Sequence, residues 1–178
     1  MLLRNSSTSR QVQPGIVSAI IKTGLLAGTL DISAALIQFY LKTGKNVLIV
    51  LKFIASAVFG KSAFEGGYDM AAMGLLFHYI IAFGWTILFF LLYPRMPLLG
   101  KKPVITGLLY GIFVWLVMNL LVVPATNISR APFRLVNSIT GALILMLAIG
   151  LPVSLLANQF YSKKSKSAIA GDDNSILR

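Results

Sequence analysis

Two ionisable side chains, Asp31 and His78, lie inside apolar segments of this sequence. Asp31 belongs to a predominantly apolar run bracketed by Lys22 and Lys42, one residue from the midpoint of that bracket. If the run crosses a bilayer, the carboxylate lies near the midplane, where a charge costs roughly 2.5–3.5 kcal/mol. Ionisable groups at that depth usually face the interior of a helix bundle and mark ion or proton pathways.

Asp31 and His78 have two interpretations. A histidine that titrates near neutral pH beside a buried carboxylate carries or senses protons, so both residues are candidate proton- or ion-binding groups. In the structural interpretation, Asp31 is protonated or hydrogen-bonded to a neighbouring helix, and His78 only forms a bond between helices. The sequence leaves both interpretations open.

The composition indicates a single membrane domain that uses the lipid bilayer as its solvent. Hydrophobic residues make up 57% of the 178 residues and charged residues 12%, whereas soluble proteins carry about 25% charged residues. The mean hydropathy is +0.82. The net charge of +11 comes from lysines and arginines at the ends of apolar runs. This pattern is typical of membrane proteins and argues against a nucleic-acid partner.

The sequence lacks the residues that most catalytic and metal-binding sites need. The chain has one histidine and no cysteine, which excludes HExxH sites and thiolate-based zinc sites. The Gly-x-Ser-x-Gly, Walker A and dinucleotide-binding patterns are absent from the sequence. We therefore expect no enzymatic activity, no catalytic residue, no cofactor and no bound metal.

Four apolar segments are long enough to cross a hydrocarbon core of ~30 Å at ~1.5 Å per residue. Pro103 and Pro124 delimit the third segment, and Pro152 is expected to kink the fourth. The four predicted spans are approximately residues 17–41, 70–93, 103–124 and 133–158.

A fifth apolar stretch, residues 46–64, is interrupted by Lys52 and by Gly60-Lys61. Stretches of this size are more often interfacial or re-entrant than spanning. The predicted fold is therefore an all-α four-helix transmembrane bundle with an additional interfacial or re-entrant helix between spans 1 and 2. Polar tails precede and follow this single domain of residues 15–160, at 1–14 and 161–178, and we expect the second to be disordered beyond Lys166.

With four spans, both termini lie on the same side of the membrane. Ten of the sixteen lysines and arginines fall on that side, so the positive-inside rule predicts cytoplasmic termini and a bacterial inner-membrane location. The ten are Arg4, Arg10, Lys22, Arg95, Lys101, Lys102, Lys163, Lys164, Lys166 and Arg178.

Small residues share helix faces with the polar ones. Gly24 and Gly28 lie on the face of Asp31, and Gly107 and Gly111 lie at successive steps of four before Trp115 and Asn119. Both glycine pairs are typical of close helix contacts, within one chain or between two chains, so a homo-oligomer or a membrane partner is expected as an alternative to internal packing. Tyrosines and tryptophans near the helix ends are expected to anchor the protein at the membrane interface.

The intramembrane polar residues also share a depth. His78 falls ~6 Å and Asn119 ~8 Å from the midpoint of its span, towards the outer side, at ~1.5 Å per residue. Gln38 and Asn137 fall in the same outer half. We expect a polar cavity that opens outward, with Asp31 at its floor and these four side chains as its lining. The alternative is that the amide side chains only join helices.

The chain resembles bacterial inner-membrane proteins of the YagU type, a four-span family without an established activity. The resemblance rests on Gly-Leu-Leu-Ala-Gly at 24–28, His78 in the second span, Gly-Leu-Leu-Tyr-Gly at 107–111, and polar residues near the start of the fourth span. It covers roughly residues 20–160 and departs from the family pattern at 46–64. It implies an inner-membrane location and a link to acid stress, and it supplies no catalytic residues.

The position of Asp31 is similar to that of the single acidic residue in the first helix of small multidrug antiporters, which are shorter four-span proteins. The sequence thus predicts a small polytopic inner-membrane protein of unknown molecular activity; if it transports anything, the expected substrates are protons or a cationic solute, at a site containing Asp31. The alternative is a structural or accessory subunit that binds partners through its small-residue helix faces.

Overall fold

The computed structural model describes residues 15–96, 98–126 and 135–176, with side chains described as far as Lys163. Every element in these ranges is helical, and none is a strand. In chain order the elements are α1 (Ile16–Thr43), α2 (Leu48–Phe59), α3 (Ser62–Glu65), α4 (Tyr68–Leu92), η1 (Tyr93–Arg95), α5 (Leu98–Lys101), α6 (Pro103–Val117), η2 (Met118–Val122), η3 (Val123–Ala125), α7 (Leu135–Leu145), η4 (Met146–Gly150) and α8 (Leu151–Ile176).

Four helical segments are long and apolar enough to cross a membrane, which confirms the predicted fold class. Span 1 is α1, and the others combine consecutive elements without a break. Two turns, η2 and η4, are π-helical and lie inside spans 3 and 4. The last three spans are Tyr68–Arg95, Pro103–Ala125 and Leu135–Lys163.

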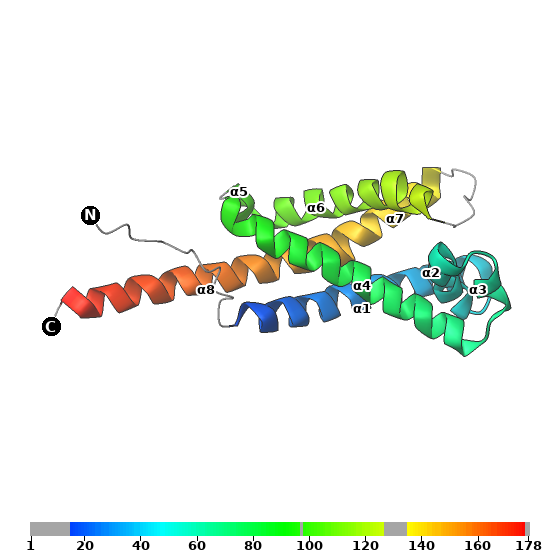
Figure 1. Cartoon of the computed structure of the whole chain (residues 1–178). Coiled ribbons are helices and arrows are strands. Elements are labelled where there is room, and N and C mark those ends of the chain that lie inside the picture. Colours follow the sequence, from blue (N-terminus) through cyan, green and yellow to red (C-terminus); the bar gives the residue numbers. More distant parts are fainter. Residues whose placement is uncertain (1–14, 97, 127–134, 177–178) are drawn as a thin grey trace, which may run out of the picture.

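The spans alternate in direction, so each end of the bundle has its own set of short helices (Figure 1). At the end that we call the α5 end, α1 begins, α4 finishes and α5 leads into α6. At the opposite end, the α2 end, α2 and α3 connect span 1 to span 2. The described parts of the chain thus begin and finish at the α5 end, as a four-span protein requires.

Glycines let spans 3 and 4 pack backbone against backbone. A Cβ added at Gly107 would lie 2.8 Å from the carbonyl oxygen of Gly150, and a Cβ at Gly111 would overlap the backbone of Met146. Spans 3 and 4 are therefore in direct contact, and span 4 also packs against α1. By contrast, α4 and α6 meet through aromatic side chains such as Trp85, stacked edge-on against Phe113.

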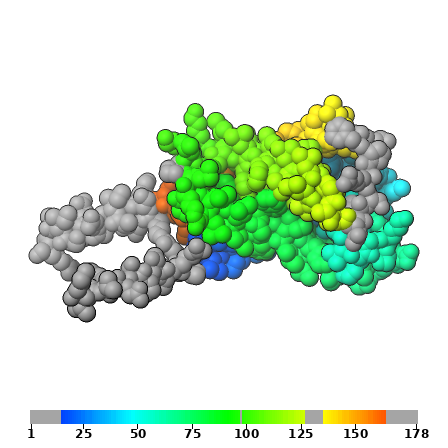
Figure 2. All heavy atoms as spheres, turned by 45° about the horizontal axis from the view of Figure 1, so that its top comes forward, coloured from blue at the N-terminus to red at the C-terminus, as the bar shows by residue number. Residues whose placement is uncertain are grey.

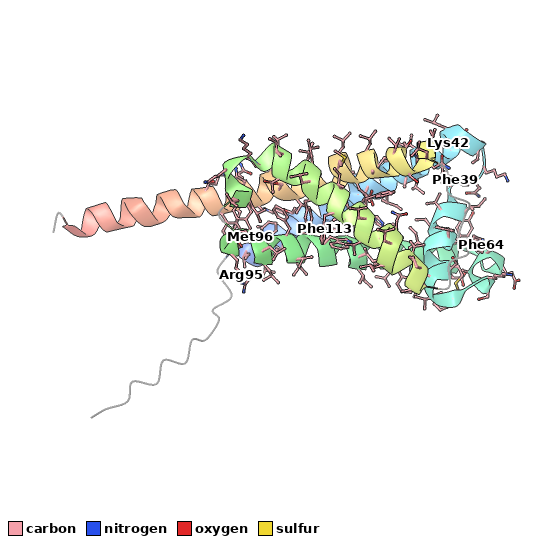
Figure 3. All side chains as sticks on the ribbon, turned by 90° about the horizontal axis from the view of Figure 1, so that it is seen from above. Phe39, Lys42, Phe64, Arg95, Met96 and Phe113 are labelled. Atoms are coloured by element: carbon pink, nitrogen blue, oxygen red, sulfur yellow. The ribbon has the colours of Figure 1, made fainter. Side chains whose placement is uncertain are left out.

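The 46–64 stretch forms the short helix α2, which lies across the α2 end of the bundle (Figures 1 and 3). Its 12 residues span only about 18 Å at 1.5 Å per residue, too short to cross a bilayer. It crosses α4 at Gly74, where a Cβ would overlap the carbonyl oxygen of Leu51. Ala71 packs in the same small core with Leu51.

Span 4 differs from its prediction in two details. The deviation from regular α-helix is the π-turn η4, which ends two residues before Pro152; a proline there also removes one N–H donor from the helix. The C-terminal tail expected to be disordered beyond Lys166 is instead helical, because α8 continues to Ile176. The predicted N-terminal tail, 1–14, lies outside the described residues.

Candidate functional site: a histidine and a carboxylate between α1 and α4

The contact between α1 and α4 depends on the two glycines of the first span. A Cβ at Gly24 would lie 2.5 Å from the ring of Phe83, and one at Gly28 would lie 3.0 Å from the ring of Tyr79. Both positions are buried. The absence of side chains on this face of α1 brings α4 close enough for polar atoms of the two helices to meet.

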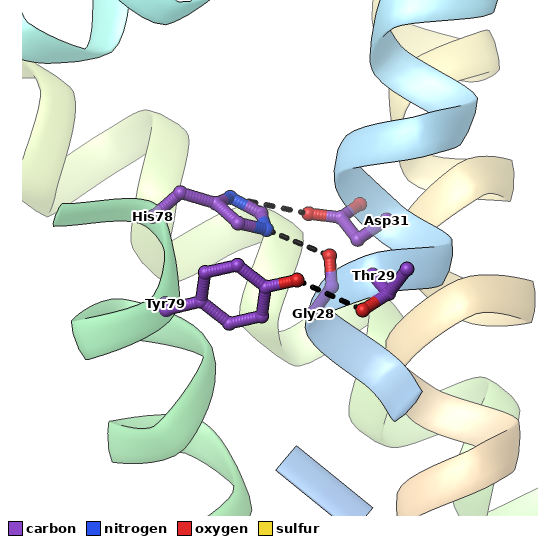
Figure 4. Close-up of polar contacts among 5 residues, drawn as sticks. All are labelled: Gly28, Thr29, Asp31, His78 and Tyr79. Carbon is purple, nitrogen blue, oxygen red and sulfur yellow. Dashed lines mark hydrogen bonds and ion pairs between the residues drawn. The ribbon is translucent and has the colours of Figure 1, made fainter. Parts of the chain in front are cut away.

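His78 of α4 uses this close approach. Its Nε2 lies 2.9 Å from the carbonyl oxygen of Gly28, within hydrogen-bond distance. Its Nδ1 lies 4.0 Å from Oδ2 of Asp31. Figure 4 shows the imidazole between these two groups of α1. The side chains of His78 and Asp31 are only 10% and 18% exposed, so the pair is largely enclosed between the helices.

The hydrogen bond to Gly28 fixes which ring nitrogen faces the carboxylate. A carbonyl oxygen only accepts hydrogen bonds, so Nε2 of His78 must carry a hydrogen. A neutral ring then presents an unprotonated Nδ1 to Asp31, and a lone pair opposite an ionised carboxylate is repulsive. One additional proton, on Nδ1 or on the carboxylate, removes that repulsion and leaves the pair without net charge.

A second hydrogen bond between α1 and α4 lies one residue along each helix from the first. The Thr29 and Tyr79 hydroxyls are 2.8 Å apart (Figure 4). This bond remains the same whether or not the imidazole and carboxylate carry the extra proton. It therefore holds the two helices in register independently of the protonation state of Asp31 and His78.

The other predicted cavity-lining residues do not gather around Asp31. Asn119 is exposed, and its side chain donates to the carbonyl of Trp115 on its own helix, at 2.9 Å. Asn137 is also exposed and accepts from Nζ of Lys42 at 3.2 Å, near the end of α1. The structure thus brings Asp31 and His78 together, and it separates both asparagines from them.

Gln38 of α1 is half-buried, and its Nε2 is the one buried side-chain nitrogen or oxygen without a hydrogen-bond partner in the described part of the chain. A buried unpaired amide is unfavourable by roughly 1–3 kcal/mol. Gln38 lies on the same helix as Asp31, two turns away towards the α2 end. It is therefore a predicted lining residue with an unpaired N–H donor near the carboxylate along the chain.

The four predicted helix-contact glycines lie at two interfaces inside the chain. Gly24 and Gly28 face α4, and Gly107 and Gly111 face span 4. Gly74, on the face of His78, packs against α2, and one further glycine with the same role, Gly150, was missed by the sequence analysis. Gly150 faces Gly107 across the spans, and its signal was the Ala148-Ile-Gly150 sequence two residues before Pro152.

A tyrosine cluster at the α5 end was also missed. Tyr93 donates to Oδ1 of Asn158 at 2.6 Å, and its ring stacks on that of Tyr161 at 4.8 Å. The hydroxyl of Tyr161 donates to the carbonyl of Phe90 at 2.9 Å. Tyr93 is buried, and the two tyrosines join span 2 to α8. Tyr93 follows Phe89 by four residues, and that spacing was the available signal.

No group of three or more metal-binding side chains occurs among the residues that the structure describes. Comparison of the chain with protein-family models, curated proteins and solved structures gives no match. The geometry of the site therefore rests on two contacts of His78, its 2.9 Å hydrogen bond to Gly28 and its 4.0 Å approach to Asp31.

Proposed function

We propose that this multi-pass membrane protein binds a proton at the Asp31–His78 pair and moves it, or a cation exchanged for it, across the bacterial inner membrane. The observation that carries the proposal is the hydrogen bond from Nε2 of His78 to the Gly28 carbonyl. This bond leaves Nδ1 facing the carboxylate at 4.0 Å, so the pair takes up and releases one proton between two helices.

The energetics of burial favour an exchangeable proton over a permanent charge. Isolated charges inside a bilayer are costly, and a protonated Asp31–His78 pair has no net charge. The 4.0 Å separation exceeds ordinary hydrogen-bond length, so a direct strong bond does not hold the proton in place. An entering cation would replace that proton beside the carboxylate and keep the site neutral.

The orientation and location of the protein form part of the proposal. Excess lysine and arginine at the α5 end support cytoplasmic termini through the positive-inside rule. The resemblance to YagU-type proteins stays a prediction; it adds the inner-membrane location and a link to acid stress, in which a proton-binding group has an obvious use.

The alternative function is a structural or accessory subunit that binds a homo-oligomeric or other membrane partner. Its support is that His78 ties α4 to α1 through a hydrogen bond, which is sufficient reason for a histidine in a membrane helix. However, the small-residue faces proposed to bind partners are covered by helices of the same chain at Gly28 and Gly111. A subunit function would therefore need a different surface.

Proton flux into liposomes discriminates between these functions. Purified protein reconstituted with an internal pH-sensitive dye and a potassium gradient with valinomycin should acidify the lumen. Asp31→Asn removes the titratable group at constant size, and we expect at least a tenfold loss of the protein-dependent flux. Asp69→Asn is the matched control, because this exposed residue in the first turn of α4 makes the same chemical change away from the pair.

No flux in either protein, with protons or with monovalent and organic cations, would contradict transport, and equal flux in the native protein and Asp31→Asn would contradict transport through the Asp31–His78 pair. Thermal unfolding of both variants provides the second readout. A large loss of stability in Asp31→Asn without any native flux would favour the structural alternative.

A further inference from the structure

The α5 end holds an apolar groove that the proposed proton site does not use. The groove has a volume of about 540 Å³ and lies between the end of α4, α5 and the first half of α6. Ligand pockets commonly measure about 300–1,000 Å³. Figure 2 shows α4 and α6 together on the near face of the molecule.

The groove exists because of how α4 and α6 meet. Glycines bring spans 3 and 4 into backbone contact, whereas Phe89 and Trp85 of α4 meet Tyr110 of α6 ring to ring, with centroids 4.7 and 6.4 Å apart. Rings of this size keep the two helix backbones apart. The space that remains is lined by apolar side chains, including Leu92, Met96, Ile105 and Leu109.

The length of the groove matches one leaflet of a membrane. Its lining extends from Lys102 to Phe113 along α6, about 16 Å at 1.5 Å per residue. Half of a ~30 Å hydrocarbon core is ~15 Å. Met96 lies at the α5 end and Phe113 towards the middle of the bundle (Figure 3), so the groove runs along the bundle from its end.

Two exposed cations, Lys101 and Lys102, line the groove at the α5 end. The described acidic side chains lie elsewhere: Asp31 in the middle of α1, and Glu65 and Asp69 at the α2 end. The described side chains thus provide no carboxylate to neutralise these lysines. The groove has a positive end and an apolar interior, which is the complement of an anionic lipid.

We propose that this groove binds one anionic phospholipid from the leaflet at the α5 end. One acyl chain lies between α4 and α6 towards Phe113, and the phosphate lies against Lys101 and Lys102. Basic pockets between membrane helices recognise anionic headgroups by the same combination of charge and apolar contact. The proposal is independent of proton transport, since it uses neither Asp31 nor His78.

Native mass spectrometry of the delipidated full-length protein tests the proposal directly. The protein in neutral detergent is titrated with dioleoyl phosphatidylglycerol or dioleoyl phosphatidylcholine. We expect one phosphatidylglycerol per chain to be retained at concentrations at which phosphatidylcholine is not. In the Lys101→Gln/Lys102→Gln variant, binding should weaken roughly 10- to 30-fold, because each lysine contributes a factor of about 5.

Two further variants and a competitor make the result decisive. Lys45→Gln/Lys61→Gln removes two exposed lysines near the α2 end and should leave binding unchanged. Leu109→Trp fills the groove at an exposed position and should weaken phosphatidylglycerol binding without changing the melting temperature. Inorganic phosphate at millimolar concentration should not displace the lipid.

Equal retention of the two lipids, or unchanged binding in the Lys101→Gln/Lys102→Gln variant, would overturn the proposal. Displacement by inorganic phosphate combined with unchanged binding in Leu109→Trp would also overturn it, because the site would then recognise free phosphate rather than a lipid.

Discussion

The two halves of the bundle satisfy their polar groups in different ways. At the α5 end, the hydroxyls of Tyr93, Tyr110 and Tyr161 each donate to a partner at 2.6 to 2.9 Å. Near the middle, Asp31 faces His78 at 4.0 Å. The first set consists of neutral hydroxyl donors, so it holds helices together without a change of charge. The second set combines one fixed bond with one contact that needs a proton.

α4 thus takes part in two kinds of interhelical contact. We call the tyrosine hydrogen bonds the rigid joint and the Asp31–His78 contact the titratable joint. Tyrosine hydroxyls, carbonyl oxygens and side-chain amides all stay neutral between pH 5 and 8, so hydrogen bonds between them do not change with pH in that range. An imidazole opposite a carboxylate, by contrast, can take up or release a proton. Substitutions at the α5 end should therefore change stability alone, and substitutions at the α1–α4 contact should change stability and proton flux together.

The largest expected effect comes from separating α1 from α4. Gly28→Leu places a branched side chain against Tyr79 and Ala82, to which even a Cβ would lie at 3.0 and 3.2 Å. We expect a loss of about 3 kcal/mol in the free energy of unfolding, since overpacking of helix contacts is costly, and flux should disappear. Unfolding of the purified protein in mixed micelles measures the change.

Gly84→Leu is the matched control for that substitution. Gly84 lies on the same helix, α4, and an added Cβ there meets no atom within 4 Å. Its unfolding free energy should stay within about 0.5 kcal/mol of the native value. A loss in Gly84→Leu as large as that in Gly28→Leu would mean that leucine disturbs α4 wherever it is placed.

Substitutions of His78 should have a smaller effect on stability, and two of them distinguish its hydrogen bond to Gly28 from its contact with Asp31. His78→Leu removes both the donor to Gly28 and the partner of Asp31, and we expect a loss of about 2 kcal/mol. His78→Gln keeps an N–H donor near the position of Nε2, so its loss should stay below about 1 kcal/mol. Both variants lack the imidazole, and in both the pH dependence of proton flux should differ from that of the native protein. Flux with unchanged pH dependence in His78→Gln would show that His78 is only a structural tie.

The smallest expected effect is at the rigid joint. Tyr110→Phe removes the 2.7 Å bond to the Trp85 carbonyl and keeps the ring, so the loss should be about 1 kcal/mol. Proton flux per folded molecule should not change. Tyr68→Phe, at an exposed ring, is the control for removal of a hydroxyl. If Tyr110→Phe lowered flux as much as Asp31→Asn does, the proposed division between the two joints would be wrong.

The spans were predictable from the sequence because their limits depend on local properties. Lys22 and Lys42 bracket the first span, and Pro103 and Pro124 mark the limits of the third. The membrane sets the required length, so no knowledge of the packing is needed. The same reasoning identified a short helix within 46–64, which is α2 at Leu48–Phe59.

The placement of Asn119 was not predictable in this way. Steps of four residues drift around a helix, and three such steps from Gly107 amount to about 120° at 3.6 residues per turn. Asn119 also lies inside the π-turn η2, which has a different number of residues per turn. Its side chain is therefore exposed, although Gly107 and Gly111 face span 4.

The pairing of Asp31 with His78 was predicted as an interpretation, but its geometry was not. Which ring nitrogen faces the carboxylate depends on the Gly28 carbonyl, a backbone atom that every residue possesses. The hydrogen bonds of Tyr110 and Tyr161 were not predicted for a related reason, because their acceptors are the backbone carbonyls of Trp85 and Phe90. Side-chain patterns do not reveal backbone acceptors between distant segments.

The backbone acceptor at Gly28 has a consequence for genetics. A saturation screen would score position 28 as intolerant because of its close contact with Tyr79, and nearly every allele would have the same steric explanation. The acceptor function of residue 28 would leave no trace in such a screen, since no side-chain change deletes a carbonyl. Only substitutions at position 78 report on the hydrogen bond to the Gly28 carbonyl. The ratio of surviving His78→Gln to His78→Leu variants would measure it, because glutamine keeps an N–H donor and leucine does not.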